Sequence, residues 1–173
     1  MVGTMPGPEK RERNRKKRTG PFVLWIIGAL VLIAADQLTK KLAVSALAGS
    51  RTILVWPGVL EFVLVENTGA AFGLGQGGQW LFVVLAALIS VFLLYDLWKG
   101  SRAEMSVLWG IGETMVMAGG IGNAVDRIRL GYVVDFIYVK LIDFPVFNAA
   151  DICVTVGMAL IALGFLTTHD RSA

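Results

Sequence analysis

Four stretches of this chain are each long and apolar enough to cross a lipid bilayer, and this feature constrains the fold more than any other. A transmembrane α-helix needs roughly 20 mostly apolar residues, because each residue adds about 1.5 Å and no water is present to satisfy exposed backbone groups. The sequence predicts such helices at about 22–41, 80–98, 105–124 and 148–167. The expected fold class is therefore an all-α membrane protein with four transmembrane helices.

Charged residues are scarce and unevenly distributed, which supports this class. Hydrophobic residues make up 55% of the 173 residues and charged residues 17%, against about a quarter charged in ordinary soluble domains. Residues 1–20 hold nine of the charged residues, so the rest of the chain is even more apolar than the average, which excludes a disordered body. The sole cysteine, Cys153, has no partner for an internal disulfide, which excludes a disulfide-built secreted scaffold.

The positions of lysine and arginine predict the orientation, because short loops rich in these residues stay on the cytoplasmic side. Of the 16 lysines and arginines, ten belong to the side of the two termini and six to the other side. We therefore expect a basic cytoplasmic tail at 1–20, a single membrane domain at 21–168 and a short cytoplasmic tail at 169–173. A basic run directly before a membrane span favours this role over nucleic-acid binding, so no nucleic-acid partner is expected.

A cleavable signal peptide is an alternative interpretation of the N-terminus. A basic region, an apolar stretch from Phe22 and the tripeptide Ala46-Leu47-Ala48 follow one another in the order that such peptides have. However, Asp36, Lys40 and Lys41 interrupt the apolar stretch before the tripeptide. We therefore expect the first helix to be retained.

Two segments, at 49–79 and 125–147, are expected to lie on the outer side of the membrane. Thr52–Val65 is rich in β-branched and aromatic residues and is interrupted by Pro57-Gly58, so it predicts a hairpin-like pair of strands followed by a Gly-rich loop. Its apolar side chains favour a position on the membrane surface or against the other outer segment. That second segment is partly apolar and ends on a turn signal, Asp143-Phe144-Pro145.

Polar residues of the membrane domain gather at one level, near the outer membrane surface. Polar groups at membrane depth are costly and usually mark a site or a structural pair. Residues three or four positions apart are neighbours on a helix, and three such groups occur here: Asp36 with Lys40, Asn123 with Asp126 and Arg127, and Asn148 with Asp151. The carboxylates with basic neighbours, Asp36 and Asp126, are most simply interpreted as ion pairs that fix helix ends.

Asp135 and Asp151 have no basic partner in the local sequence. Burial among the apolar neighbours of Asp135 should raise the pKa of its carboxyl group. Two carboxyl groups brought close together cannot both ionise easily, so one keeps a proton, as in the pair with which aspartic proteases activate water. Spacing alone leaves three alternatives open: Asp135 pairs with Asp151, Asp143 is a member of the pair, or neither is catalytic.

Other intramembrane chemistries lack the residues that they require. A zinc protease or a bis-histidine haem needs several ligands, and the single histidine, His169, belongs to the cytoplasmic end. No metal or other cofactor is therefore expected. A Ser-Lys pair is a weak alternative. Ser45 lies five residues from Lys40 and four from Lys41, but within an ordinary helical pattern this spacing does not mark a catalytic pair. Gly119-Gly120-Ile121-Gly122 favours close helix packing over a phosphate loop, since no strand precedes it.

Five blocks of sequence occur in an order that resembles the lipoprotein signal peptidases, also called signal peptidase II. The blocks are Asp36-Gln37-Leu38-Thr39-Lys40, Asn67-Thr68-Gly69-Ala70-Ala71-Phe72, Gly119-Gly120-Ile121-Gly122-Asn123-Ala124-Val125-Asp126-Arg127, Val133-Val134-Asp135-Phe136 and Phe147-Asn148-Ala149-Ala150-Asp151. The resemblance covers about 22–166 of the chain. Each block is weak alone, but the five in this order are highly specific.

The resemblance implies a multi-pass aspartic endopeptidase of the bacterial cytoplasmic (inner) membrane. It further implies four transmembrane helices, a small β-rich cradle on the outer, periplasmic side, and an active site at that outer face. The substrates would be prolipoproteins whose cysteine carries diacylglycerol, cut on the amino side of that cysteine. Membrane lipids would surround the protein, which is expected to act as a monomer.

The resemblance also assigns residues to roles. Asp135 and Asp151 match the catalytic pair, in which one carboxylate acts as general base on a water and its protonated partner polarises the scissile carbonyl. The sequence does not determine which of the two holds the proton. The positions that match supporting or substrate-binding residues are Asp36, Lys40, Asn67, Gly69, Asn123, Asp126, Arg127 and Asn148.

Glu113 departs from the resemblance, because it lies near the middle of the third predicted helix, where the family is usually apolar. We expect a carboxyl that stays protonated or bonds across helices, with a proton or substrate contact as the alternative. A small cation-coupled transporter is a different class of function, in which Asp36, Glu113 and Asp126 would line a path. Such a path requires polar residues through the whole bilayer, whereas here, Glu113 apart, they gather on one side.

Overall fold

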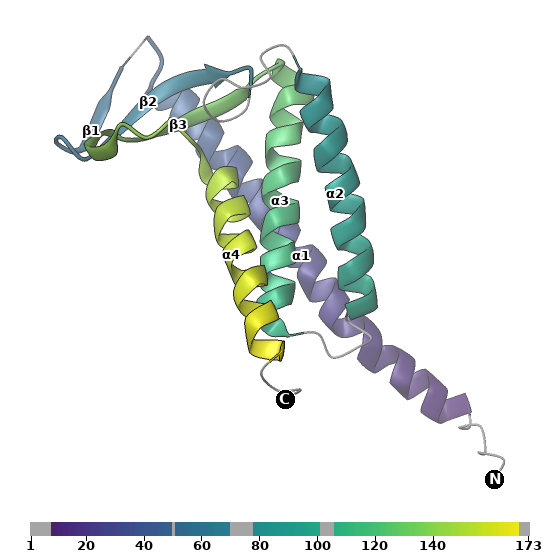
Figure 1. Ribbon diagram of the computed structural model, residues 1–173. Helices are drawn as coiled ribbons and strands as arrows, with labels where there is room; N and C mark the ends of the chain where they lie inside the picture. Colours follow the sequence, from purple (N-terminus) through teal and green to yellow (C-terminus); the bar gives the residue numbers. More distant parts are fainter. Residues whose placement is uncertain (1–7, 50, 70–77, 101–105, 170–173) are drawn as a thin grey trace.

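The computed structural model describes residues 8–49, 51–69, 78–100 and 106–169. Most of the predicted Gly-rich loop, at 70–77, and the ends of the two predicted tails lie outside the described residues. The described residues form a helical bundle with a small sheet at one end (Figure 1). In chain order the elements are α1 Pro8–Ala46, β1 Ile53–Trp56, β2 Leu60–Asn67, α2 Gln79–Gly100, α3 Val107–Leu130, β3 Val133–Val139, the short 3-10 helix η2 Lys140–Ile142 and α4 Ala149–His169.

Three of the four predicted membrane-spanning segments are confirmed as long, apolar helices. Phe22–Ala46 of α1, Gln79–Gly100 of α2 and Ala149–Leu166 of α4 are long and apolar enough to cross a membrane. Helix α3 is less apolar, because small and charged residues replace many of the large apolar ones along its length. Its place in the bundle explains the difference: α3 packs against α1, α2 and α4, which pack little against one another (Figure 1).

Two helices are longer than the sequence predicted. Helix α1 begins at Pro8, within the basic segment that was predicted to be a tail, since lysine, arginine and glutamate are good helix formers and proline is tolerated in a first turn. Helix α3 continues to Leu130 and ends where Gly131 adopts a left-handed conformation (φ 84°) and donates its N–H to the carbonyl of Arg127 at 3.1 Å. The apolar stretch had predicted an end at about 124, but the polar residues that follow it continue the helix.

Glycine residues allow α3 and α4 to pack closely. A Cβ atom on Gly112 would lie 2.7 Å from the carbonyl oxygen of Gly157, and the same distance separates a Cβ on Gly157 from the carbonyl of Gly112. A Cβ on Gly119 would collide with the carbonyl of Ala150, and one on Gly122 would lie 2.6 Å from a carboxylate oxygen of Asp36. The predicted packing role of the glycine cluster is thus confirmed at two of its positions.

The sheet has the order β1-β2-β3 and is antiparallel throughout. The predicted hairpin is confirmed as β1 and β2, whereas β3 was not predicted as a strand. Val65 of β2 pairs with Asp135 of β3, after a β-bulge that begins at Phe62. The sheet packs on the end of α1, where Phe136 contacts Ala43 and Leu47. It therefore covers the end of the bundle opposite the two termini (Figure 1).

The α3–α4 contact gives a direct test of this packing. Gly112→Ala and Gly157→Ala should each lower the free energy of unfolding by about 1–3 kcal/mol, because the added methyl group overlaps backbone atoms that cannot move. Gly120→Ala is the matched control, since its Cβ would meet Ala86 at an ordinary 3.9 Å. Thermal unfolding in detergent measures the difference, and equal midpoints for all three variants would contradict the close contact.

Candidate functional site

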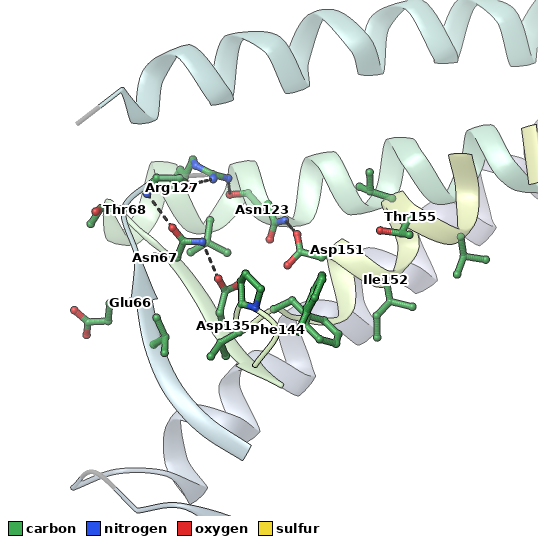
Figure 2. A pocket seen from close by; sticks show the side chains of 18 residues that line it. Glu66, Asn67, Thr68, Asn123, Arg127, Asp135, Phe144, Asp151, Ile152 and Thr155 are labelled. Carbon is green, nitrogen blue, oxygen red and sulfur yellow. Dashed lines mark hydrogen bonds between the residues drawn. The ribbon is translucent and has the colours of Figure 1, made fainter. Parts of the chain in front are cut away.

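Two aspartates from different elements line one cavity at the sheet end of the bundle. Asp135 lies on β3 and Asp151 lies in the first turn of α4, and the cavity between the sheet, α3 and α4 measures about 810 Å³. Figure 2 shows the two side chains together with Asn67, Asn123 and Arg127 around this cavity. The structure thus brings the predicted pair to one site. Asp143 is exposed, accepts a bond from the Tyr138 hydroxyl at 2.6 Å and does not line the cavity.

A reciprocal capping arrangement fixes the side chain of Asp151. Asn148 precedes α4, and its Oδ1 accepts the backbone N–H of Asp151 at 3.0 Å. In return, Oδ2 of Asp151 accepts the backbone N–H of Asn148 at 3.0 Å. This is the geometry of a capping box, in which residues three apart satisfy each other's free N–H groups. The other oxygen, Oδ1 of Asp151, accepts a bond from Nδ2 of Asn123 at 2.8 Å.

Asp135 is held by two amide groups and is 2% exposed. Its Oδ2 accepts a bond from Nδ2 of Asn67 at 2.8 Å, and its Oδ1 accepts one from Nδ2 of Asn148 at 2.6 Å. Burial raises the pKa of Asp135 to about 6, and the neighbouring charge of Asp151 acts in the same direction. The two amide bonds and the more distant Lys40 charge lower this pKa without cancelling the effect of burial.

The orientation of each of the three asparagine amides follows from a neighbour that can donate but not accept. Oδ1 of Asn67 accepts the N–H of Gly69 at 2.9 Å, and Oδ1 of Asn123 accepts the Lys40 ammonium at 2.8 Å. Oδ1 of Asn148 accepts a helix N–H, as described above. Each amide must therefore turn its NH2 group toward an aspartate. The site presents donors to both carboxyl groups, which is what an ionised or singly protonated pair requires.

The predicted neighbours Asp36 and Lys40 form an ion pair at 3.0 Å, and Lys40 also pairs with Asp126 at 2.8 Å. All three side chains are buried. Gln37, which the sequence did not single out as a site residue, bridges the two carboxylates through Nε2, at 2.9 Å from Asp126 Oδ1 and 3.2 Å from Asp36 Oδ2. Its position directly after Asp36, in a block of polar residues, was the available signal.

Arg127 connects α3 to the end of β2. Its Nη2 donates to the carbonyl of Gly69 at 2.9 Å, and its Nη1 donates to the carbonyl of Asn123 at 3.4 Å. Its guanidinium also lies 4.9 Å from the ring centre of Phe82, a cation–π distance. Arg127 and Gly69 both line the cavity, together with the two aspartates.

The apolar side of the cavity was not predicted from the sequence. It is formed by one end of β2, the start of β3, the segment after η2 and the first turns of α4, with the apolar residues Val65, Val133, Phe144, Pro145, Val146, Phe147, Ile152, Val154 and Val156. Glu66, Thr68 and Thr155 also line the cavity. Thr68, Val133 and Phe147 belong to the blocks that resemble the family, but nothing in the sequence assigned these residues to the lining of a cavity.

Glu113 does not line the cavity. It is 2% exposed, and its polar neighbours are Asp96 of α2 and Trp109 one turn away. Because Oε2 of Glu113 is buried without a hydrogen-bond partner among the described residues, the protonated carboxyl and the bond across helices stay predictions. Within the described ranges, no group of three or more His, Cys, Asp and Glu side chains is arranged to hold a metal ion.

Comparisons with known proteins agree on one family. The family model described as "Signal peptidase (SPase) II" matches residues 28–167. The chain is 39% identical to the lipoprotein signal peptidase of Lactococcus lactis subsp. lactis (strain IL1403), over 86% of this chain and 97% of that protein. It is 38% identical to that of Gloeobacter violaceus, over 84% and 83%.

A solved structure shares the fold as well. It is described as a bacterial membrane enzyme determined by the in meso method at 2.3 Å resolution, and it aligns with a TM-score of 0.78 and 29% identity. The alignment covers 87% of this chain and 92% of that one.

Substitutions at Asn148 can separate its capping role from its contact with Asp135. Asn148→Ala should lower the free energy of unfolding by about 1 kcal/mol more than Asn148→Ser, because serine retains an oxygen that caps α4 and alanine does not. Both variants lose the amide donor to Asp135, so that loss cancels in the comparison. Thermal unfolding in detergent, followed by circular dichroism, measures the difference in stability between the two variants. Equal stability of the two variants would show that Asn148 does not cap the helix.

Proposed function

Because this chain belongs to the signal peptidase II family, we propose that it removes signal peptides from bacterial prolipoproteins. We further propose that it is an aspartic endopeptidase, with Asp135 and Asp151 as the catalytic residues. The observation that supports this mechanism best is that two aspartates, each with both oxygens held by donors, line one cavity at the end of a membrane bundle.

The charge balance of the site supports a pair that shares a proton. Two cationic side chains lie at the site: Arg127 lines the cavity, and Lys40 is buried directly behind it. The carboxyl groups there number four, belonging to Asp36, Asp126, Asp135 and Asp151. Since Lys40 is shared by Asp36 and Asp126, full ionisation would leave excess negative charge in a buried cluster. The raised pKa of Asp135 makes it the better proton holder.

The proposed reaction uses both aspartates and one water. The Asp151 carboxylate takes a proton from the water as its oxygen attacks the scissile carbonyl carbon, while protonated Asp135 donates to the carbonyl oxygen. The tetrahedral intermediate collapses when Asp151 passes its proton to the leaving amine nitrogen and Asp135 recovers its own. The carbon–nitrogen bond breaks, and both aspartates return to their starting states.

The apolar side of the cavity supports a lipid-bearing substrate. Ile152, Val154 and Val156 of α4, with Phe144 and Pro145, give an apolar lining next to the polar side that holds the aspartates. We propose that the diacylglycerol on the substrate cysteine lies against this lining and extends toward the lipid. The peptide bond on the amino side of that cysteine would then lie between the two aspartates.

The arrangement of the chain ends supports a cytoplasmic location for both of them. We propose that the chain crosses the membrane four times, and that α3 crosses it in contact with the other three helices. An even number of spans leaves both termini on one side, and in Figure 1 the beginning of α1 and the end of α4 both lie away from the sheet, which supports this arrangement. The many basic residues near the N-terminus assign that side to the cytoplasm. The site would then open at the outer face of the inner membrane of a monomeric protein surrounded by lipid.

The transporter alternative receives no support from the relatives. Two of the three carboxyl groups that would line its path, Asp36 and Asp126, are both ion-paired with Lys40. The third, Glu113, is buried beside Asp96 and does not line the cavity.

A cleavage assay tests the proposed function. The purified protein should release the signal peptide from a diacylglyceryl-modified lipobox peptide, and Asp135→Asn or Asp151→Asn should slow release by about 10²–10⁴-fold, the usual contribution of a general acid or base. Asp143→Asn is the matched control, because that carboxyl lies outside the cavity and should leave activity unchanged. Chromatography of the products measures the rate. Near-normal activity in both dyad variants would contradict the assignment.

The pH dependence tests which aspartate holds the proton. If protonated Asp135 is required, kcat/KM should fall as the pH rises through the pKa of this residue, about 6, because the free enzyme then loses the proton that it must donate. Initial rates at low substrate between about pH 4 and 8 measure this profile. A rise in kcat/KM across the same interval would mean that Asp135 is the base and Asp151 the proton holder.

A further inference from the structure

Two buried carboxylates outside the cavity hold the backbone beside the two cavity aspartates. Oδ1 of Asp36 accepts the backbone N–H of Ala150, the residue before Asp151, at 3.0 Å. Oδ2 of Asp126 accepts the backbone N–H of Val134, the residue before Asp135, at 3.2 Å. Each carboxylate therefore restrains the position from which one dyad side chain extends.

One ammonium group joins these two carboxylates. Lys40 Nζ lies 3.0 Å from Asp36 Oδ2 and 2.8 Å from Asp126 Oδ2, and the three side chains are at most 4% exposed. Its remaining bond goes to Oδ1 of Asn123 at 2.8 Å, so three donors meet three acceptors. That last bond turns the Asn123 NH2 group toward Asp151.

None of the three charged residues lines the cavity, whereas Asn67, Asn123 and Arg127 do. A substrate in the cavity would therefore meet the dyad and its amide donors without touching Lys40, Asp36 or Asp126. Their effect on the reaction must pass through the backbone of β3 and α4, through Asn123 and through the field of their charges. The sequence had placed all these residues in one group, as supporting or substrate-binding. The cavity lining divides that group into residues that a substrate could contact and residues that it could not.

We propose that Lys40, Asp36 and Asp126 are positioning residues that set the spacing of Asp135 and Asp151 and do not bind substrate. The proposal rests on the proposed function, since it concerns the spacing of the proposed catalytic pair. Burial makes the arrangement stiff, because an ammonium and two carboxylates without water have few alternative partners. An altered spacing would affect the chemical step, which depends on the alignment of the dyad, more than the binding of substrate.

Kinetic analysis of Lys40→Met and Asp36→Asn tests the proposal. In the folded variants, kcat should fall by about 10–100-fold while KM stays within about 3-fold, since misplacing a catalytic group by even about 1 Å can lower the rate by 10²-fold. Lys40→Met should also move the pH–rate profile to higher pH, because the ammonium favours the ionised form of Asp135. A purely structural role would lower the amount of folded protein without moving this profile.

Lys140→Met is the matched control. Lys140 of η2, which is half exposed, forms an ion pair at 2.7 Å with the buried carboxylate of Glu61 in β2, away from the cavity. Its loss removes a lysine–carboxylate pair of similar geometry, and kcat and the pH profile should stay unchanged.

Several outcomes would overturn the proposal. Unchanged kcat in folded Lys40→Met and Asp36→Asn would do so, as would a raised KM with normal kcat, which would indicate substrate contact. Loss of folded protein in both variants would mean that the cluster serves the fold as a whole. Each of these results presupposes that the unmodified chain cleaves the diacylglyceryl peptide. Failure of the unmodified chain to do so would instead refute the proposed function.

Discussion

The Lys40 ammonium is the group on which the sheet end of this molecule depends. A charge that is removed from water costs several kcal/mol unless its surroundings replace every bond that water made. Here three acceptors do so, two carboxylates and one amide oxygen, and they come from α1 and α3. Through those acceptors the same group reaches β3 at Val134 and α4 at Ala150. The positions of β3 and of the start of α4 thus depend on one side chain in α1.

The small residues of α3 let its neighbours pack closely, and this brings a carboxylate of α1 within reach of α3 and α4. Gly122 leaves room for Asp36, whose oxygen would lie 2.6 Å from a Cβ at that position. Gly119 permits the backbone of α4 to approach at Ala150. The backbone N–H of Ala150 then donates to Asp36. The same small residues that lower the hydropathy of α3 therefore allow the helix to carry polar groups inside the bundle. The less apolar helix is the central one for this reason.

Much of this arrangement could be predicted from the sequence, and the remainder depends on contacts that spacing does not encode. Length and apolarity predicted the helices, and Pro57-Gly58 predicted the hairpin, because these signals are local. The i,i+4 relation predicted the pair of Asp36 with Lys40. The strand β3 was missed, since its seven residues lie between two helices and pair with β2 across a long stretch of chain. The anchoring of Val134 and Ala150 was beyond prediction, because backbone N–H groups have no side-chain signature.

The central claim is that Asp135 and Asp151 activate a water that cuts the peptide directly. A single turnover in water labelled with heavy oxygen, followed by mass spectrometry of the products and of the protein, tests it. The account expects label in the new carboxyl end of the released signal peptide, and both aspartates unlabelled. Label in the carboxyl group of Asp135 or Asp151 would contradict it, because an aspartate would then have attacked the carbonyl itself.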